Sequence, residues 1–220
     1  MTTTPLSMLD QAELLQLAIT SGQRNDAASA LSYLKEAVSR DDAGPNAYLL
    51  LGAEYAEIGL YDRAISAMEM ALQIDPAMAL ARLQLGLLVL SSGDAVKAET
   101  ILQPLATNMA TGTLPGAAAG ADADAGTADA AGHAANDGEA LVLFARGLIH
   151  LIHDEFDAAL ENLTQGMSGN AGNLALNRNM QKIIDGINQL PEEVRKQAAA
   201  NKDESQMRHV LLSAYTDTVH

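Results

Sequence analysis

The amino-acid sequence predicts an all-α fold built from stacked helical hairpins. The chain has 220 residues, and 48% of them are hydrophobic, which is enough apolar material for a sizeable core. Only 3% are aromatic and tryptophan is absent, so the apolar content is mainly Ala and Leu, which favour helix. Apolar residues also recur at helical spacing in units of about 34 residues, and such a period is typical of a repeat architecture.

The repeat is visible when the chain is compared with itself at a shift of one such unit. Small residues then align where the axes of two antiparallel helices must approach closely, and large apolar residues align on either side of them. Gly59 falls in the turn between two helices, and Asp75-Pro76 ends the second helix. The aligned sets are Leu17, Leu51 and Leu85; Ala18, Gly52 and Gly86; Ala30, Ala64 and Ala98; and Leu34, Met68 and Leu102.

The best copy, residues 45–78, resembles the tetratricopeptide repeat family, and we expect a bacterial member. The resemblance implies an α-α superhelix whose first helices line a concave, protein-binding side, with no catalytic role. Residues 79–112 and 11–44 keep fewer of the pattern's positions. The matching residues of the best copy are Tyr48, Leu51, Gly52, Tyr55, Gly59, Ala64, Met68, Ala71 and Pro76.

A fourth copy follows an insertion. The stretch "LFARGLIHLIHDEFDAALENLTQGM" has Gly147, Phe156, Ala159 and Leu163 in the same internal order, although Arg146 takes the leucine position. The preceding tract, 111–138, consists almost wholly of Ala, Gly, Asp and Thr. Each glycine costs a helix about 1 kcal/mol, so we expect a flexible surface loop, and a neutral insertion is favoured over an acidic lure for partners.

The last part of the chain is predicted to form helices that cap the stack, because a terminal hairpin otherwise exposes an apolar face. The expected domains are 1–110 with three hairpins, 111–138 as the insertion, 139–170 as the fourth hairpin, and 171–220 as C-terminal helices. The expected helices are 9–21, 26–39, 45–58, 61–73, 77–91, 94–107, 139–152, 155–167, 173–189, 191–201 and 204–216.

Charge and motifs exclude several classes of function. A formal net charge of −15 opposes the approach of nucleic acid and of anionic lipid. The longest apolar run, "LGLLVL", is too short for membrane insertion, and "MTTTPLSMLD" shows no signal peptide, so we expect a cytoplasmic location. Without cysteine, a phosphate-binding loop or a nucleophile elbow, the sequence predicts neither an enzyme nor a bound cofactor.

We therefore expect a non-catalytic scaffold or chaperone-like module that binds an apolar or amphipathic segment of another protein. Its first helices offer no Lys or Asn cluster for a carboxylate. Whether the chain's own helix around Met207, Val210 and Leu211 covers this strip stays open, and so does homo-oligomerisation. The candidate partner-binding residues are Leu49, Ala53, Leu80, Leu83, Leu87, Leu90, Phe144 and Leu148.

The alternative is a metal-dependent or enzymatic regulator that uses His150 and His153. With Asp154, these residues fall at i, i+3 and i+4 on one predicted helix, a spacing that can direct three ligands to one metal ion. Such pairs also arise by chance in a packing repeat, and no second ligand cluster is evident. We therefore expect a structural or surface role for them and no metal site.

Overall fold

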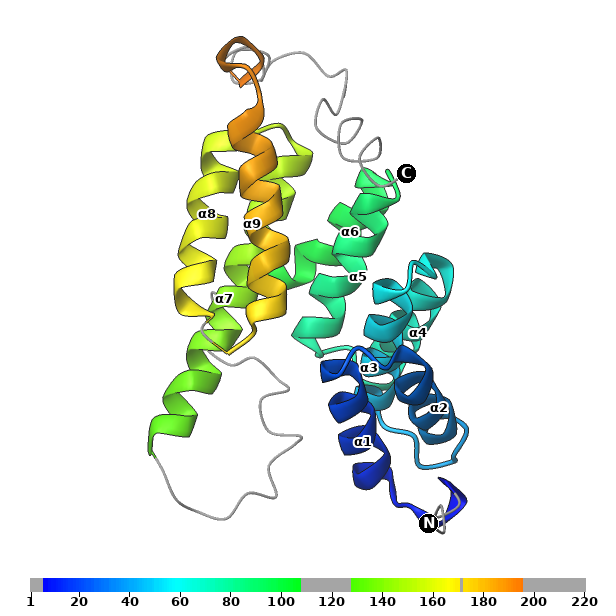
Figure 1. Cartoon of the computed structure of the whole chain (residues 1–220). Helices are drawn as coiled ribbons and strands as arrows, with labels where there is room; N and C mark the ends of the chain where they lie inside the picture. The colour runs from blue at the N-terminus through cyan, green and yellow to red at the C-terminus, as the bar shows by residue number, and fades with distance from the viewer. Residues whose placement is uncertain (1–5, 108–127, 171, 196–220) are drawn as a thin grey trace. The chain divides into compact units, whose positions relative to one another are not determined.

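The computed structural model describes residues 6–107, 128–170 and 172–195, and the side chains of 128–137 lie outside that description. All regular secondary structure among these residues is helical, which confirms the predicted all-α class of helical hairpins (Figure 1). The chain divides into two compact units, which we call unit 1 (Met1–Leu88) and unit 2 (Val89–His220). The boundary falls inside one helix, α5 (Ala79–Ser91).

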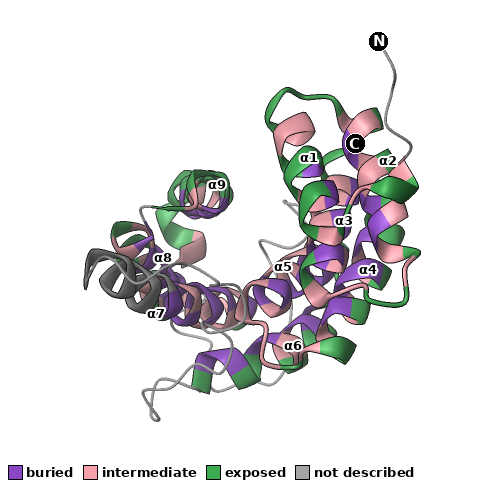
Figure 2. Ribbon diagram, turned by 90° about the horizontal axis from the view of Figure 1, so that it is seen from below, coloured by how far each residue is buried: buried purple, intermediate pink, exposed green. Residues whose placement is uncertain are grey.

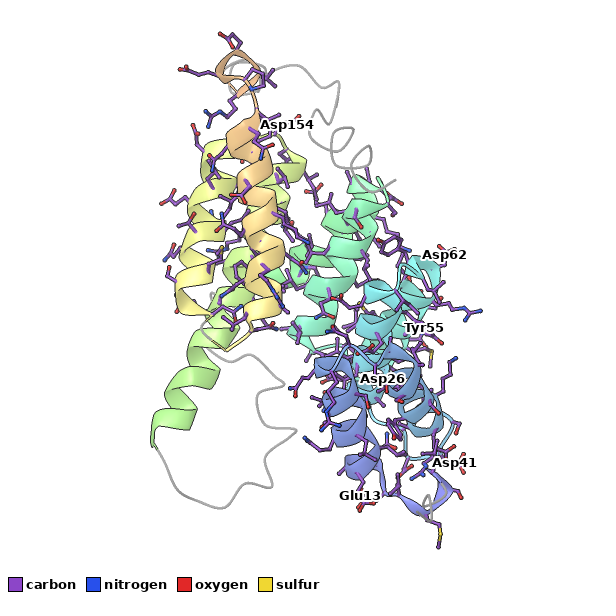
Figure 3. The ribbon with its side chains drawn as sticks, viewed as in Figure 1. Glu13, Asp26, Asp41, Tyr55, Asp62 and Asp154 are labelled. Carbon is purple, nitrogen blue, oxygen red and sulfur yellow. The ribbon has the colours of Figure 1, made fainter. Side chains whose placement is uncertain are left out.

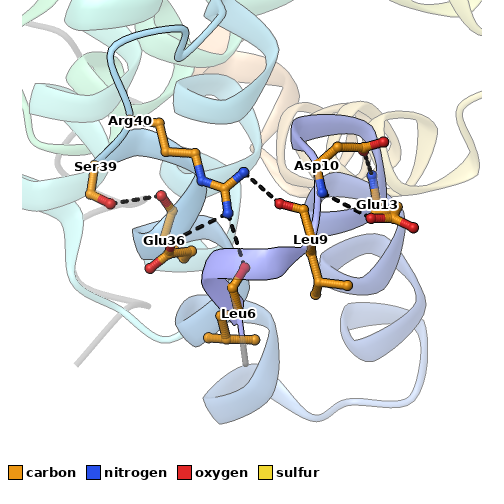
Figure 4. Close-up of polar contacts among 7 residues, drawn as sticks. All are labelled: Leu6, Leu9, Asp10, Glu13, Glu36, Ser39 and Arg40. Carbon is orange, nitrogen blue, oxygen red and sulfur yellow. Dashed lines mark hydrogen bonds and ion pairs between the residues drawn. The ribbon is translucent and has the colours of Figure 1, made fainter. Parts of the chain in front are cut away.

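Unit 1 contains two complete hairpins and the first part of α5. Hairpin 1 is formed by α1 (Gln11–Gln23) and α2 (Ala27–Val38), and hairpin 2 by α3 (Pro45–Glu57) and α4 (Tyr61–Ile74). Helix α1 begins with a capping box (Figure 4): the Glu13 N–H donates to the Asp10 carboxylate at 2.7 Å, and the Asp10 N–H donates to Glu13 at 2.8 Å.

One arginine fastens the start of unit 1 to hairpin 1. Arg40, just after α2, donates from Nη1 to the Leu9 carbonyl at 2.6 Å and from Nη2 to the Leu6 carbonyl at 2.9 Å (Figure 4). Nη2 also pairs with Glu36, one helical turn earlier, at 3.3 Å. The 3-10 helix Leu6–Met8 is therefore held by charge-assisted hydrogen bonds between groups that are distant in sequence.

The turns between paired helices recur at the spacing of the repeat, and the turn after α7 has the same form. Four residues adopt positive φ in the described part of the chain: Asn25 at 58°, Gly59 at 76°, Gly93 at 90° and Asp154 at 55°. One repeat unit separates each of the first three from the next, and Asp154 precedes Ala159 by the same interval as Gly93 precedes Ala98. A left-handed residue at the same place of each repeat closes the same turn four times.

The helix crossings follow the same register. A Cβ placed on Gly52 would lie 2.8 Å from Cγ of Met68, and one placed on Gly147 would lie 2.7 Å from Cγ of Leu163. The two glycines occupy the same repeat position, and so do the two side chains that they face. Buried residues accordingly follow the facing sides of α3 and α4 (Figure 2), and the missing side chain of Gly52 permits this approach in hairpin 2.

Unit 2 contains the end of α5 followed by α6 (Ala95–Thr107), α7 (Ala128–Ile152), α8 (Phe156–Gly169) and α9 (Leu174–Gln189). Helices α7 and α8 form hairpin 4, while α6 packs on α7 and α9 on α8 (Figure 1). Nε of Arg146 donates to the Ala106 carbonyl, near the end of α6, at 2.9 Å. The arginine in the leucine position of the fourth copy thus satisfies a helix-end carbonyl.

The start of α7 differs from the expected boundary. The insertion was expected to run to residue 138, yet α7 begins at Ala128, and 108–127 lie outside the described residues. The expected cost of the glycines applies to an isolated segment. Once packing on α6 and α8 fixes the later turns of α7, adding Ala-rich turns at its beginning requires no new nucleation.

The C-terminal prediction is confirmed as far as the structure describes it. Helix α9 was expected at 173–189, and its apolar stripe is buried as a cap on hairpin 4 would require. A further helical turn starts after Pro191, whose carbonyl accepts from the N–H groups of Val194 and Arg195. The rest of the expected helices 191–201 and 204–216 lies outside the described residues. The buried stripe comprises Leu176, Met180, Ile183, Ile184 and Ile187.

Candidate binding surface

The predicted strip is unevenly accessible in unit 1. Leu83 is completely buried, and Leu49 joins Ala71 and Ala81 in a core cluster against which Leu80 packs. Three of the predicted residues keep part of their surface exposed: Ala53 on α3, and Leu80 and Leu87 on α5. Within this unit, only these three predicted side chains can meet a partner without a rearrangement of the core.

The predicted residues of unit 2 are all buried. Leu90 is nearly covered, and Phe144 and Leu148 have no exposed surface. The Phe144 ring fills the space that Gly166 leaves on α8, because a Cβ on Gly166 would lie 2.7 Å from two atoms of that ring. Phe144 therefore belongs to the interior of hairpin 4, and its place on a first helix does not make it a contact for a partner.

One residue of the accessible surface was missed from the sequence. Ile19 on α1 is 39% exposed and occupies the same repeat position as Ala53 and Leu87, since one repeat unit separates each from the next. The signal was available, because the shift that links Ala53 to Leu87 leads back to Ile19. Successive first helices of unit 1 thus carry an apolar side chain at one recurring, accessible position, and we call Ile19, Ala53 and Leu87 the first-helix surface.

The two histidines are each engaged by a carboxylate in unit 2. Nδ1 of His150 lies 2.5 Å from Oε2 of Glu155, and Nε2 of His153 lies 2.9 Å from Oε1 of Glu99 on α6. The two rings therefore face different partners on different elements. Across the described ranges, no group of three or more His, Cys, Asp or Glu residues is arranged to hold a metal ion.

An acidic side chain is packed between the first helices of unit 1. Glu54 of α3 lies against Gly22 of α1, so that a Cβ on Gly22 would come within 2.5 Å of the Glu54 carboxylate. Burial, together with the nearby Glu57 carboxylate, raises the pKa of Glu54. Helix α3 therefore carries two neighbouring acidic groups, one of which is partly desolvated.

Polar groups between α8 and α9 have a structural role. Asn170 is buried, donates to the Asn177 side chain at 2.8 Å, and accepts from that side chain at its backbone carbonyl at 2.7 Å. Asn173 caps α9 by accepting from the Leu176 N–H at 3.0 Å. This network satisfies itself, so it fixes the turn between the two helices and is not available to a ligand.

Helices long and apolar enough to cross a bilayer do not occur in the part of the chain that the structure describes. The chain matches no protein-family model and no curated protein.

Among solved structures, the chain is similar to MamA (residues 41 to the end) from Desulfovibrio magneticus RS-1. The two are 16% identical, with a TM-score of 0.52 over 96% of this chain and 97% of that one. A double mutant of MamA RS-1 is similar at 16% identity and a TM-score of 0.51, with the same coverage. At this identity the likeness concerns the fold, and it supports the all-α hairpin architecture seen here.

Proposed function

We propose that this chain is a non-catalytic protein-binding module of the tetratricopeptide type, acting in the cytoplasm. Its partner contributes an apolar or amphipathic segment that lies along the first-helix surface. The observation that carries the proposal is the recurrence of accessible apolar side chains, Ile19, Ala53 and Leu87, at one position of successive first helices. A helix or extended segment can engage such a row because its own side chains recur regularly.

The chemistry of the described residues favours binding over catalysis. A catalytic site needs titratable groups gathered in a shared cleft, and the histidines His150 and His153 instead pair with separate carboxylates. The first-helix surface presents aliphatic side chains, which supply contact area but no nucleophile or base. Covering a large aliphatic side chain contributes up to about 1.5–3 kcal/mol, so a few partly exposed ones support a reversible contact.

Site-specific photocrosslinking tests this proposal. A photoreactive residue is introduced at Ala53 or at Leu87, and at Met70 as the control, because Met70 is 37% exposed but lies on α4, a second helix. We expect one partner to crosslink at the two first-helix positions and not at Met70. Equal labelling at all three positions would contradict the proposal. A crosslink to residues 196–220 of the same chain would show that the surface is covered internally.

A further inference from the structure

The turn of hairpin 2 carries a cluster of exposed apolar side chains. Ile58, Leu60 and Tyr61 are 42%, 40% and 43% exposed, and they follow one another around Gly59 between α3 and α4. We call these three residues the tip patch. They lie at the end of the hairpin, where the turn joins the two helices, and are distinct from the first-helix surface.

The other hairpin turns are polar at the corresponding positions. The residue before the left-handed one is Arg24, Ser92 or His153 in the other turns, and the residue after it is Asp26, Asp94 or Glu155. Hairpin 2 has Ile58 and Leu60 in these two places. Solvent-exposed turns usually carry polar side chains. Among the four turns described, hairpin 2 alone has apolar residues on both sides of its left-handed residue.

Leu60 also leaves the start of α4 without a side-chain helix cap. Asp26 accepts from the Ser29 N–H at 3.1 Å, and Asp94 accepts from the Lys97 N–H at 3.0 Å, so both satisfy a free N–H at the start of the following helix. Leu60 precedes α4 at the same place and has no side-chain acceptor to offer. The first turn of α4 thus lacks a stabilising interaction that two other second helices have.

The backbone conformation of the turn does not require leucine. Leu60 has φ −88° and ψ 63°, close to −95° and 73° at Asp26 and to −85° and 66° at Glu155. Its N–H donates to the Tyr55 carbonyl at 2.8 Å, and the Asp26 N–H makes the equivalent bond to Ser21 at 2.9 Å. The same turn forms with aspartate, so folding alone does not explain the apolar side chains.

The surroundings of the tip patch are acidic. Glu57 precedes Ile58, and Asp62 follows Tyr61 at the start of α4 (Figure 3). The nearest basic residue in sequence, Arg63, lies over the ring of Tyr55, with its guanidinium carbon 5.9 Å from the ring centroid. A second copy of this chain, with a net charge of −15, would bring like charges to the patch, whereas a basic partner would complement it.

We propose that the tip patch docks a basic amphipathic helix of a partner protein. Its apolar face covers Ile58, Leu60 and Tyr61, while Lys or Arg side chains at the edge of that face approach Glu57 and Asp62. Tyr61 suits the centre of such a contact because it combines a large apolar ring with a polar hydroxyl. This site is independent of the first-helix surface, so either one can fail without the other.

The test is the double variant I58S/L60D, which gives hairpin 2 the Ser and Asp found in the turn before α6. The probe is a synthetic Leu/Lys amphipathic helix with its Leu residues on one face, and its affinity is measured by fluorescence anisotropy at about 0.15 M salt. Docking predicts at least a roughly tenfold loss of affinity. Non-specific attraction predicts tighter binding, because the variant gains a negative charge. The two explanations therefore predict opposite changes in the affinity of the variant for the peptide.

Controls separate the proposal from its rivals. V96S removes an exposed apolar side chain near another turn and should leave the affinity unchanged. A Leu/Glu peptide of the same pattern should not bind. Circular dichroism should show that I58S/L60D stays helical, with a melting temperature equal to or above that of the native chain because a cap is restored.

Three results would overturn the proposal. The first is equal or tighter binding of the Leu/Lys peptide by I58S/L60D, and the second is equal binding of the Leu/Glu peptide by the native chain. The third is self-association of the native chain in sedimentation experiments that I58S/L60D abolishes, because the patch would then be occupied by a second copy.

Discussion

Filling the helix crossing of hairpin 2 is expected to destabilise the protein even with a single methyl group. In Gly52→Ala, the new Cβ would lie 2.8 Å from Cγ of Met68 and 3.2 Å from the Ala64 carbonyl oxygen. Met68 is 1% exposed, so its side chain cannot move out into solvent, and the carbonyl belongs to the α4 backbone. Relief of these contacts requires α3 and α4 to separate.

Two opposing effects determine how much Gly52→Ala changes the free energy of unfolding. Overpacking a core position costs about 1–3 kcal/mol, and replacing glycine by alanine inside a helix returns about 1 kcal/mol. By the same two effects, Gly52→Ala should lose up to about 2 kcal/mol. Gly186→Ala is the matched control, because Gly186 lies inside α9 and a Cβ there would meet no atom within 4 Å. That variant should gain up to about 1 kcal/mol.

Urea denaturation followed by circular dichroism in the far ultraviolet measures both variants against the native chain. In thermal denaturation of a protein of this size, a change of about 1 kcal/mol in stability corresponds to a shift in melting temperature of about 2–4 °C. Gly147→Ala should repeat the loss in unit 2, because its Cβ would lie 2.7 Å from Cγ of the buried Leu163. If Gly52→Ala stabilises the protein as much as Gly186→Ala does, the proposed role of close helix approach is wrong.

Three further variants test individual contacts. Glu54→Gln should raise the free energy of unfolding at pH 7. Because the pKa of Glu54 is raised in the folded state, the native chain loses stability as the pH increases through this raised pKa. The stabilities of the native chain and the variant should therefore converge below the ordinary pKa of 4.5. Asp10→Ala removes the acceptor of the Glu13 N–H and should cost about 1 kcal/mol in thermal melts. Arg146→Met keeps an unbranched side chain but removes the guanidinium, which leaves the Ala106 carbonyl without its donor. The variant should cost about 1–3 kcal/mol in urea titrations, whereas an unchanged midpoint would show that water replaces the bond.

The helices and their pairing were predictable because each depends on local signals. The left-handed turn at Gly59 and the small residue Gly52 recur with the hydrophobic period, so each level of the pattern supports the others. The beginning of α7 was not predictable from these signals. The sequence of its first turns shows no apolar periodicity, and these turns are helical because they extend a helix that is packed further along.

The binding surface was less predictable, because repeat position does not determine exposure. Phe144 and Leu83 share their position with Leu49, and all three are buried. For Phe144 the deciding residue is Gly166 on the following helix, whose missing side chain admits the ring. The tip patch shows the converse, since the apolar residues Ile58 and Leu60 were visible in the sequence but only the structure shows that they are exposed.

The packing of neighbouring elements also has a consequence for how fast and in what order the chain folds. The helix pairs described above join segments adjacent in sequence, and proteins dominated by such local contacts fold in microseconds to milliseconds. The segment 108–127 separates α6 from α7 and is much longer than the segment 39–44 between α2 and α3. Because each doubling of a connection adds about 0.6 kcal/mol to the entropic cost of closing it, we expect hairpin 4 to form on its own and to dock on α6 last. Pulse-labelling hydrogen exchange should then protect the amides of α7 and α8 before those of α6, and simultaneous protection of all three helices would exclude this order.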